Sequence, residues 1–218
     1  YKLTLISRNI DEIKFFLDGL NINTKEIEFI CMDLKEIDKF QLYYENLKSK
    51  HDIVISAIGE LSKDTDSHKM NLIDQMINSN YIYPAKCLEV ISNVFLRENS
   101  PKEKIILGIS SVAGDRGRAT NFYYGAAKSA FTVFLSGLRQ KLSKSKITII
   151  TVSLGFVDTK MTKEEKIPNL LNTNPETIAK KIIECVEKKK LFYVPIRWKI
   201  IMTIVKLIPE SIFRKLNF

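Results

Sequence analysis

The stretch ISSVAGDRGRATNFYYGAAK, residues 109–128, decides how the rest of this chain is interpreted. It places Ser111 thirteen residues before Tyr124, and Lys128 four residues after Tyr124. If a helix begins near Tyr124, Tyr124 and Lys128 lie on the same helical face. An ammonium beside a phenol favours the phenolate, so we expect Lys128 to lower the pKa of Tyr124. Ser111, at the end of a strand, would hydrogen-bond a substrate oxygen, which is the chemistry of a carbonyl or alcohol oxidoreductase.

These residues resemble the short-chain dehydrogenase/reductase family, in which a Ser, a Tyr-x-x-x-Lys pair and an upstream Asn form a catalytic tetrad. The segments SSVAG before the pair and LGFVDT after it make the resemblance specific, because Tyr and Lys four residues apart usually form a surface pair. The resemblance implies a single-domain α/β fold with a doubly wound, Rossmann-type parallel sheet and a nicotinamide cofactor. It assigns catalysis to Ser111, Tyr124, Lys128 and Asn80, and it gives Tyr124 and Lys128 a part in cofactor binding.

The composition agrees with one soluble α/β domain: 218 residues, 45% of them hydrophobic, with 8 glycines and 6 prolines. Three cysteines, Cys31, Cys87 and Cys185, lie in apolar segments without CxxC spacing, which predicts buried thiols of a cytoplasmic protein. With only two histidines, His51 and His68, a histidine-based metal site is not expected. The sequence contains no apolar run long enough to span a membrane.

The first strand of the sequence, residues 2–7, matches the second strand of the family. The family's first strand and its glycine-rich phosphate turn are not found before it, so we expect an N-terminal βα unit to be missing. A chain without that unit would neither fold normally nor bind the cofactor well. Arg8, after this strand, favours NADP(H) over NAD(H), because an Arg there accommodates the 2′-phosphate. Asp33, after the next strand, matches the family's aspartate beside adenine, and it also suits a helix N-cap before residues 35–49.

The next two elements carry Gly59 and Asn80. Residues 52–59, DIVISAIG, predict a strand buried on both faces, in the place of the family's NNAG motif. Gly59 would allow the backbone to approach the nicotinamide closely. Residues 70–98 predict a long helix with a kink at Pro84. Asn80 matches the tetrad asparagine, which in the family holds a water of the proton relay, and it could equally repair the backbone of the kinked helix.

Residues 147–154 predict another buried strand, and LGFVDT follows as the counterpart of the family's PG-x-x-x-T element. The resemblance assigns cofactor contacts to Gly155, Val157 and Thr159. Residues 160–174 would form the substrate lid, and Asn174-Pro175 would begin a helix ending near Lys189. A last strand is expected at residues 191–195. In the family the Tyr124 helix pairs across a dimer axis, so a homo-oligomer is expected.

The loop DRGR, residues 115–118, suggests a substrate class. With SSVAG and YGAAK it looks like the reductases that act on polyprenyl-phosphate-linked keto-pentoses in cell-envelope synthesis. Arginine binds phosphate oxygens bidentately, so Arg116 and Arg118 suit such a substrate. Alternatively, Asp115 pairs with one of the arginines and only stiffens the loop.

The formal charge of +9 is concentrated at the end of the chain, where residues 188–218 include eight basic residues and one acidic residue. This distribution favours a local partner surface over general nucleic-acid binding. We therefore divide the chain into a catalytic domain, 1–195, and a basic amphipathic tail, 196–218. Residues 198–208 predict a short helix with a tryptophan, lysines and a broad apolar face, which suits peripheral contact with an anionic membrane. The same face could instead cover the substrate cleft or a neighbouring subunit.

The sequence therefore predicts an NADP(H)-dependent ketoreductase acting on a sugar or a lipid-linked sugar. Two alternatives remain open at this point: a reductase of fatty-acyl or other hydrophobic ketones, and a cofactor-binding regulator without turnover. The intact Ser111, Tyr124 and Lys128 argue against the regulator, whereas the missing glycine-rich turn and the altered NNAG motif argue for it.

Overall fold

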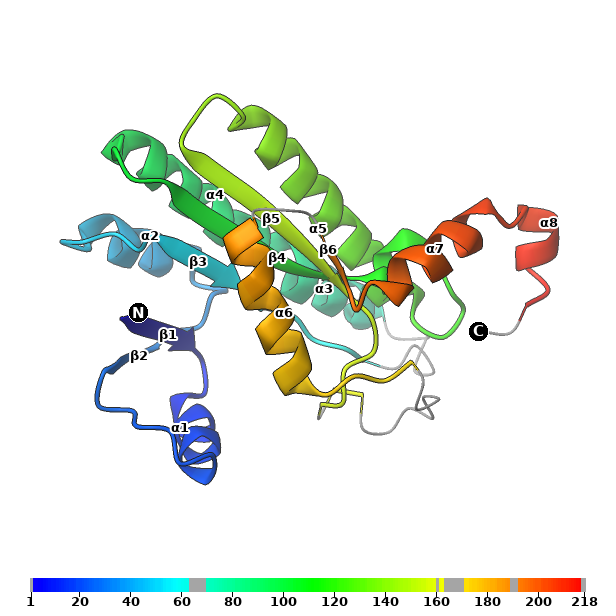
Figure 1. Ribbon diagram of the computed structural model, residues 1–218, viewed down its shortest axis with the longest axis horizontal. Helices are drawn as coiled ribbons and strands as arrows, with labels where there is room; N and C mark the ends of the chain where they lie inside the picture. Colours follow the sequence, from blue (N-terminus) through cyan, green and yellow to red (C-terminus); the bar gives the residue numbers. More distant parts are fainter. Residues whose placement is uncertain (1, 63–69, 160, 163–170, 189–191, 217–218) are drawn as a thin grey trace. The chain divides into compact units, whose positions relative to one another are not determined.

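The computed structural model describes residues 2–62, 70–159, 161–162, 171–188 and 192–216. The chain forms two compact units, Tyr1–Lys48 and Ser49–Phe218. Each is built on parallel strands, with a two-stranded sheet in the first unit and a four-stranded sheet in the second (Figure 1). Parallel strands joined through helices confirm the predicted α/β class.

The first unit is a strand–helix–strand crossover followed by a second helix. Its elements are β1 (Leu3–Ser7), α1 (Ile10–Gly19), β2 (Ile27–Cys31) and α2 (Ile37–Asn46). The side chain of Asn9 caps α1 by accepting the amide hydrogen of Glu12, with an N–O distance of 3.2 Å. Because β1 and β2 pair in parallel, with Ser7 opposite Cys31, their carboxyl ends meet at one edge of this sheet.

The second unit alternates strands and helices and ends in two short helices. Its elements are β3 (Ile53–Ser56), α3 (Met70–Ile77), the π-helical turn η2 (Asn78–Ile82), α4 (Tyr83–Glu98), β4 (Lys104–Ser111), the 3₁₀ turn η3 (Val112–Asp115), α5 (Phe122–Lys141), β5 (Ile147–Leu154), α6 (Pro175–Lys188), β6 (Phe192–Val194), α7 (Arg197–Leu207) and α8 (Glu210–Phe213). The strand order is β3-β4-β5-β6, with every neighbouring pair parallel. The predicted lid, residues 160–174, lies largely outside the described residues.

Helices cover both faces of the four-stranded sheet, as a doubly wound fold requires (Figure 1). Consecutive residues of a strand point to opposite faces of the sheet, and two residues at the centre of β4 show how each face is packed. Leu107 packs in a buried cluster with Ile178 and Cys185 of α6. At Gly108, on the other face, a Cβ atom would lie 2.4 Å from a methyl group of Leu135 in α5. Glycine at this position therefore lets α5 pack directly on the sheet.

The predicted burial of residues 52–59 on both faces is wrong. The strand itself is shorter, Ile53–Ser56, and it lies at the edge of the four-stranded sheet. Ile55 is 48% exposed, whereas Ser56 is buried. An apolar run without alternation predicts a strand that is buried on both faces. The run does not indicate which neighbouring strands or helices bury those faces.

The interruption predicted for the long helix is found one turn before Pro84. α3 gives way to the π-helical turn η2, in which the amide of Tyr83 donates to the carbonyl of Asn78, five residues earlier. Proline has no N–H, so Pro84 cannot donate to the carbonyl of Asn80, its partner in a regular helix. The wider π-helical turn, which contains Asn80, accommodates the loss of this hydrogen bond.

Candidate active site

Ser111 stands at the carboxyl edge of the four-stranded sheet. It is the last residue of β4 and lies opposite Leu154 of β5 in the register. The chain then turns into η3, and the hydroxyl oxygen of Ser111 accepts the amide hydrogen of Ala113, at 3.1 Å. Ligands of open α/β sheets bind at this edge, so the local sequence places Ser111 where a site is expected.

Two glycines allow η3 to pack directly against α5, the helix that carries Tyr124 and Lys128. A Cβ atom at Gly114 would lie 2.7 Å from the amide nitrogen of Ser129, and one at Gly125 would lie 2.8 Å from the carbonyl oxygen of Ala113. Both contacts are with backbone atoms, which cannot move aside as a flexible side chain would. The glycines of SSVAG and YGAAK thus set the distance between Ser111 and the helix.

Tyr124 lies in the first turn of α5 and forms a hydrogen bond with Ser111. Burial raises the pKa of Tyr124 above its ordinary value of 10.0, while the bond with Ser111 and the positive charge of Arg118 lower it in part. Because burial dominates, the phenol is protonated at neutral pH. A protonated phenol paired with a hydroxyl can donate a proton to a substrate carbonyl.

Lys128 lies one helical turn after Tyr124, and its side chain is buried. Its Nζ atom is 5.8 Å from the centroid of the Tyr124 ring. It donates to the carbonyl oxygens of Ile58 and Ile109, at 3.4 and 3.3 Å. Burial disfavours the charged form and lowers the pKa of Lys128 to about 8. At neutral pH the ammonium therefore remains mostly charged inside the protein.

The prediction that the pKa of Tyr124 is lowered is wrong. The lowering influences on Tyr124 are the hydrogen bond with Ser111 and the charge of Arg118, and burial outweighs both. The ammonium of Lys128 donates to two backbone carbonyls, and its Nζ lies 5.8 Å from the centroid of the Tyr124 ring. The i, i+4 spacing predicted the shared face correctly, but it does not determine how strongly burial acts on the phenol.

Asn80 and Gly59 lie beside the Lys128 ammonium. A Cβ atom at Gly59 would fall 2.9 Å from Oδ1 of Asn80 and 3.0 Å from Nζ of Lys128. The amide group of Asn80 accepts the amide hydrogen of Glu60 at 3.0 Å and donates to the carbonyls of Glu60 and Met76, at 2.9 and 3.0 Å. The side chain of Asn80 thus ties the chain after β3 to the π-helical turn, which is a role in supporting the backbone. Its part in a proton relay stays a prediction.

These residues fit a nicotinamide cofactor. An ammonium has three donors, and among the residues that the structure describes Lys128 donates to two carbonyls, which leaves one donor for a ribose hydroxyl. Only glycine leaves room at position 59, directly beside that ammonium. When bound, such a cofactor would supply the hydride for carbonyl reduction.

The segment after β5 has structural roles of its own. The Gly155 amide donates to the carbonyl of Val194 at 3.0 Å, and a Cβ atom at Gly155 would overlap the indole of Trp198. The hydroxyl of Thr162 donates to the carbonyl of Val157 and accepts the amide hydrogen of Thr159, so it closes the turn. The need for glycine at 155 therefore has a cause in packing, and the cofactor contacts of Gly155, Val157 and Thr159 stay predictions.

Arg8 and Asp33 belong to the first unit, where they follow the paired ends of β1 and β2 at one edge of that sheet. Arg8 is exposed. The side chain of Asp33 accepts the amide hydrogen of Lys35 at 3.0 Å, in the turn before α2. Glu36, not Asp33, is the N-cap residue of α2. Neither binding role is tested by these contacts.

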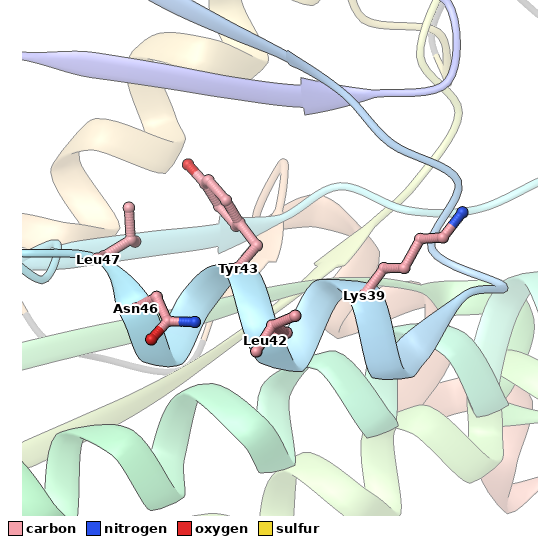
Figure 2. A pocket seen from close by; sticks show the side chains of 5 residues that line it. All are labelled: Lys39, Leu42, Tyr43, Asn46 and Leu47. Carbon is pink, nitrogen blue, oxygen red and sulfur yellow. The ribbon is translucent and has the colours of Figure 1, made fainter.

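A shallow pocket in the first unit is lined by four residues of α2 and by the residue that follows the helix: Lys39, Leu42, Tyr43, Asn46 and Leu47 (Figure 2). Burial, and secondarily the charge of Glu28, raise the pKa of Tyr43. None of the predicted site residues lines this pocket.

Arg116 does not serve as the phosphate ligand that the DRGR loop suggested, and it does not pair with Asp115. Its Nη1 donates to the carbonyl of Val205 at 2.6 Å, and its Nη2 pairs with the carboxylate of Glu210 at 2.9 Å. Asp115 instead faces Lys206, with 3.9 Å between Oδ2 and Nζ. Both partners come from the end of the chain, about 90 residues away. The DRGR loop also suggested phosphate binding for Arg118. Nothing in the sequence indicated that the charge of Arg118 influences the pKa of Tyr124.

The two buried cysteines, Cys87 and Cys185, do not suit a nucleophile. Burial raises the pKa of Cys87 to about 12 and that of Cys185 to about 11, so both are protonated thiols at neutral pH. Cys31 is exposed, contrary to the prediction that all three are buried. Within the described ranges, no group of His, Cys, Asp or Glu side chains could hold a metal ion.

Known proteins resemble this chain in sequence and in fold. The family profile described as short chain dehydrogenase matches residues 1–169. An uncharacterised oxidoreductase of Staphylococcus aureus is 23% identical over 192 residues, covering 87% of this chain and 81% of the relative. An uncharacterised oxidoreductase of Staphylococcus epidermidis is 25% identical over 162 residues, covering 74% of this chain and 69% of the relative.

Solved structures share the fold at low sequence identity. A short chain dehydrogenase from Burkholderia cenocepacia, in complex with NADP, has a TM-score of 0.77 and 12% identity, covering 99% of this chain and 97% of the other. A short chain dehydrogenase from Mycobacterium paratuberculosis, bound to NAD, has a TM-score of 0.67 and 16% identity, covering 85% and 78% of the two chains.

Proposed function

Because the chain belongs to the short-chain dehydrogenase family, whose members are NAD(P)-dependent oxidoreductases, we propose that it is an NADP(H)-dependent ketoreductase. The observation that carries this proposal is the hydrogen-bonded pair of Ser111 and Tyr124, with the buried ammonium of Lys128 behind it. The proposed substrate is a keto-sugar, free or linked to a polyprenyl phosphate, of the kind used in cell-envelope synthesis.

Each group has one task in the proposed reaction. Ser111 donates a hydrogen bond to the substrate carbonyl and orients it, and Tyr124 protonates the oxygen as it becomes an alkoxide. Lys128 stabilises the tyrosinate left behind and holds a ribose hydroxyl with its third donor. The raised pKa of Tyr124 favours this direction, because a phenol that is protonated at neutral pH is ready to act as an acid.

Two arginines support the finer parts of the proposal. The positive charge of Arg118 partly lowers the pKa of Tyr124, and a positive charge acting on this tyrosine also suits a substrate that carries a phosphate. Arg8 follows strand β1, in the place where the family carries its 2′-phosphate determinant, which supports NADP(H). A substrate preference of this kind rests on resemblance and charge, since a shared fold does not determine the substrate.

One observation favours the second candidate, a reductase of hydrophobic ketones. Val112, next to Ser111, packs in a buried cluster with Trp198 and Met202 of α7. An apolar cluster next to the catalytic serine is compatible with a substrate that carries a hydrocarbon chain. A keto-sugar carried by a polyprenyl lipid combines such a chain with a phosphate.

Substitution of Tyr124 tests the proposed function, and its neighbour provides a matched control. We expect Tyr124→Phe to lower kcat for ketone-dependent NADPH oxidation about 100- to 10,000-fold, which is the contribution of a general acid. Tyr123→Phe removes the same hydroxyl from a tyrosine without lysine four residues later, and we expect less than a threefold change. The assay uses the purified protein with a short-chain polyprenyl-phosphoryl keto-pentose and, in parallel, with an aliphatic ketone.

Cofactor binding to both variants is measured by NADPH fluorescence, and we expect it to be retained. Equal activities of the two variants would refute the role of Tyr124. A wild-type protein that binds NADPH but reduces neither ketone would favour the regulator.

A further inference from the structure

Helix α7 is apolar on two opposite sides. Trp198 and Met202 lie on the inner side, each 3% exposed. Four residues on the other side, which we call the outer stripe, recur at helical spacing and are 60–77% exposed: Ile196, Ile200, Ile204 and Leu207. A surface helix of a globular protein normally carries polar residues on the face opposite its buried side. The outer stripe departs from this pattern and needs a separate explanation.

The inner side of α7 is anchored firmly, so the helix cannot rotate to bury the outer stripe. The indole of Trp198 packs against Gly155 and forms an edge-on contact with Phe156, with 5.6 Å between ring centroids. At the other end of α7, the guanidinium of Arg116 donates to the carbonyls of Val205 and Ile208, at 2.6 and 2.5 Å. Its carbon Cζ lies 3.8 Å from the centroid of the Phe213 ring. Arg116 thereby satisfies the last carbonyls of α7 and joins α7 to α8.

Basic residues border the outer stripe. Lys199 and Lys206, both exposed, are seven residues apart and therefore lie along one flank of the stripe. Arg214 and Lys215, also exposed, follow α8. Two acidic groups lie nearby, but Glu210 pairs with Arg116, and Asp115 stands 3.9 Å from Lys206, so positive charge remains in excess. The surface therefore combines a narrow apolar band with a positive border, which is the composition that binds anionic lipid head groups.

We propose that the outer stripe of α7 binds the surface of an anionic lipid bilayer, with the helix lying in the plane of the membrane. Eleven residues of helix extend about 16 Å, which is too short to cross the hydrocarbon core but suits burial along the interface. No helix in the described part of the chain is long and apolar enough to cross a membrane. The lysines can extend their charged ends towards head groups while their alkyl stems remain near the stripe.

The charges favour a membrane over a second copy of the chain. Two copies that buried their outer stripes against each other about a twofold axis would bring two positive borders together, and like charges at a contact oppose association. An anionic bilayer supplies the opposite charge along the whole border. The proposal therefore commits to lipid, and the alternative occupant becomes an outcome of the experiment.

Docking through α7 would bring the catalytic serine close to the membrane surface. Val112 follows Ser111 directly and packs on Trp198 and Met202 of the same helix. This consequence rests on the proposed function and identifies the substrate class as a carbonyl carried on a membrane lipid. Binding to vesicles, in contrast, requires neither cofactor nor ketone and can be measured independently.

The experiment is flotation with vesicles of phosphatidylglycerol and phosphatidylcholine, compared with vesicles of phosphatidylcholine alone. We expect wild-type protein to bind the anionic vesicles at least tenfold better, and high salt to weaken binding. The double variant Ile200→Glu with Ile204→Glu should lose at least tenfold in binding. Its matched control, Leu42→Glu with Val133→Glu, makes the same charge change at two exposed apolar residues outside α7 and should bind like wild type.

Trp198 is the single tryptophan of the chain, so unchanged emission verifies that α7 keeps its packing in each variant. The proposal is overturned if wild-type protein binds both kinds of vesicle equally or binds neither. It is also overturned if the α7 variant floats as wild type does, or if its only effect is to convert an oligomer into a monomer. Activity of the α7 variant with a soluble aliphatic ketone separates the two proposals. If the variant keeps this activity but no longer floats with the vesicles, both proposals are supported. If wild-type protein floats but has no reductase activity, the proposed function alone is contradicted.

Discussion

Two buried lysines contact opposite ends of strand β4, and they differ in what surrounds them. Lys104 is the first residue of the strand, whereas Lys128 belongs to α5 and donates to the carbonyl of Ile109. Lys104 begins the strand and is 4% exposed; its ammonium lies 3.1 Å from a carboxylate oxygen of Asp52 and 3.5 Å from one of Glu98. Lys128 is also 4% exposed, but it donates to the carbonyls of Ile58 and Ile109, and no ion pair of Lys128 is found among the described residues.

The difference separates a structural charge from a functional one. Lys104 is neutralised by its partners, as buried charges in proteins normally are. Lys128 has no carboxylate partner in the described part of the chain, and its charge lies beside Tyr124, with a pKa lowered to about 8 from 10.5. A shift of this size corresponds to on the order of 3 kcal/mol of unfavourable burial at neutral pH. Such an arrangement weakens the fold and is expected where the charge is needed for catalysis.

The largest expected effect is on activity. We expect Lys128→Met to lower kcat/KM for ketone reduction at least 100-fold, because the tyrosinate formed on proton donation loses its stabilising charge. Lys104→Met removes an equally buried ammonium from the first residue of β4 and should change kcat/KM less than twofold. Steady-state NADPH oxidation measures both variants. Similar losses in the two variants would contradict the distinction between the lysines.

The second effect is on stability and has a defined pH window. The folded-state pKa of Lys128, about 8, is lower than the unfolded value of 10.5, so the unfolded chain binds more protons between these limits. The free energy of unfolding contributed by Lys128 therefore rises as pH increases through this window, by on the order of 3 kcal/mol. The raised pKa values of Tyr124, Cys87 and Cys185 act in the opposite direction above about pH 9.

The contribution of Lys128 is isolated by comparing wild type with Lys128→Met in urea unfolding from pH 7 to pH 10. We expect the variant to be the more stable protein at pH 7, with its advantage shrinking as pH rises. A variant less stable than wild type at pH 7 would mean that the Lys128 ammonium stabilises the fold.

The smallest effect is expected for Lys104→Met in the same unfolding experiment. The carboxylates that lose their partner are partly solvated, with 61% of the Asp52 side chain and 33% of the Glu98 side chain exposed. The variant should therefore lose only about 1–2 kcal/mol at pH 7. This change in the free energy of unfolding has the opposite sign to the change expected for Lys128→Met. If Lys104→Met instead made the protein more stable, the contrast between the two sites would be refuted.

The sequence predicted those parts of the site that depend on short spacing. The interval between Tyr124 and Lys128 determines their shared face, and Pro84 determines the disturbed turn at Asn80, because both effects act within one or two helical turns. Asn174 caps α6 as predicted, accepting the amide hydrogen of Thr177 at 2.8 Å.

The sequence did not predict the contacts that join distant segments. Arg116 binds the end of α7, about 90 residues away, and nothing in the DRGR loop indicates that partner. The exposure of Ile55 depends on which strand lies beside it, and the pKa of Tyr124 depends on how completely other segments exclude water. These properties arise from tertiary packing, which periodicity and spacing describe only in part.

The protonation state of Tyr124 is tested most directly by an ultraviolet difference titration that compares wild type with Tyr124→Phe, with Tyr123→Phe as the control. Burial should keep the phenol of Tyr124 protonated as the acid of a reductase, in spite of the nearby charge of Lys128. We therefore expect the phenol of Tyr124 to titrate above pH 10 in the wild-type protein. The difference spectrum between wild type and Tyr124→Phe should then show no tyrosinate between pH 7 and pH 9. A tyrosinate signal in that range that disappears only in Tyr124→Phe would contradict this central claim.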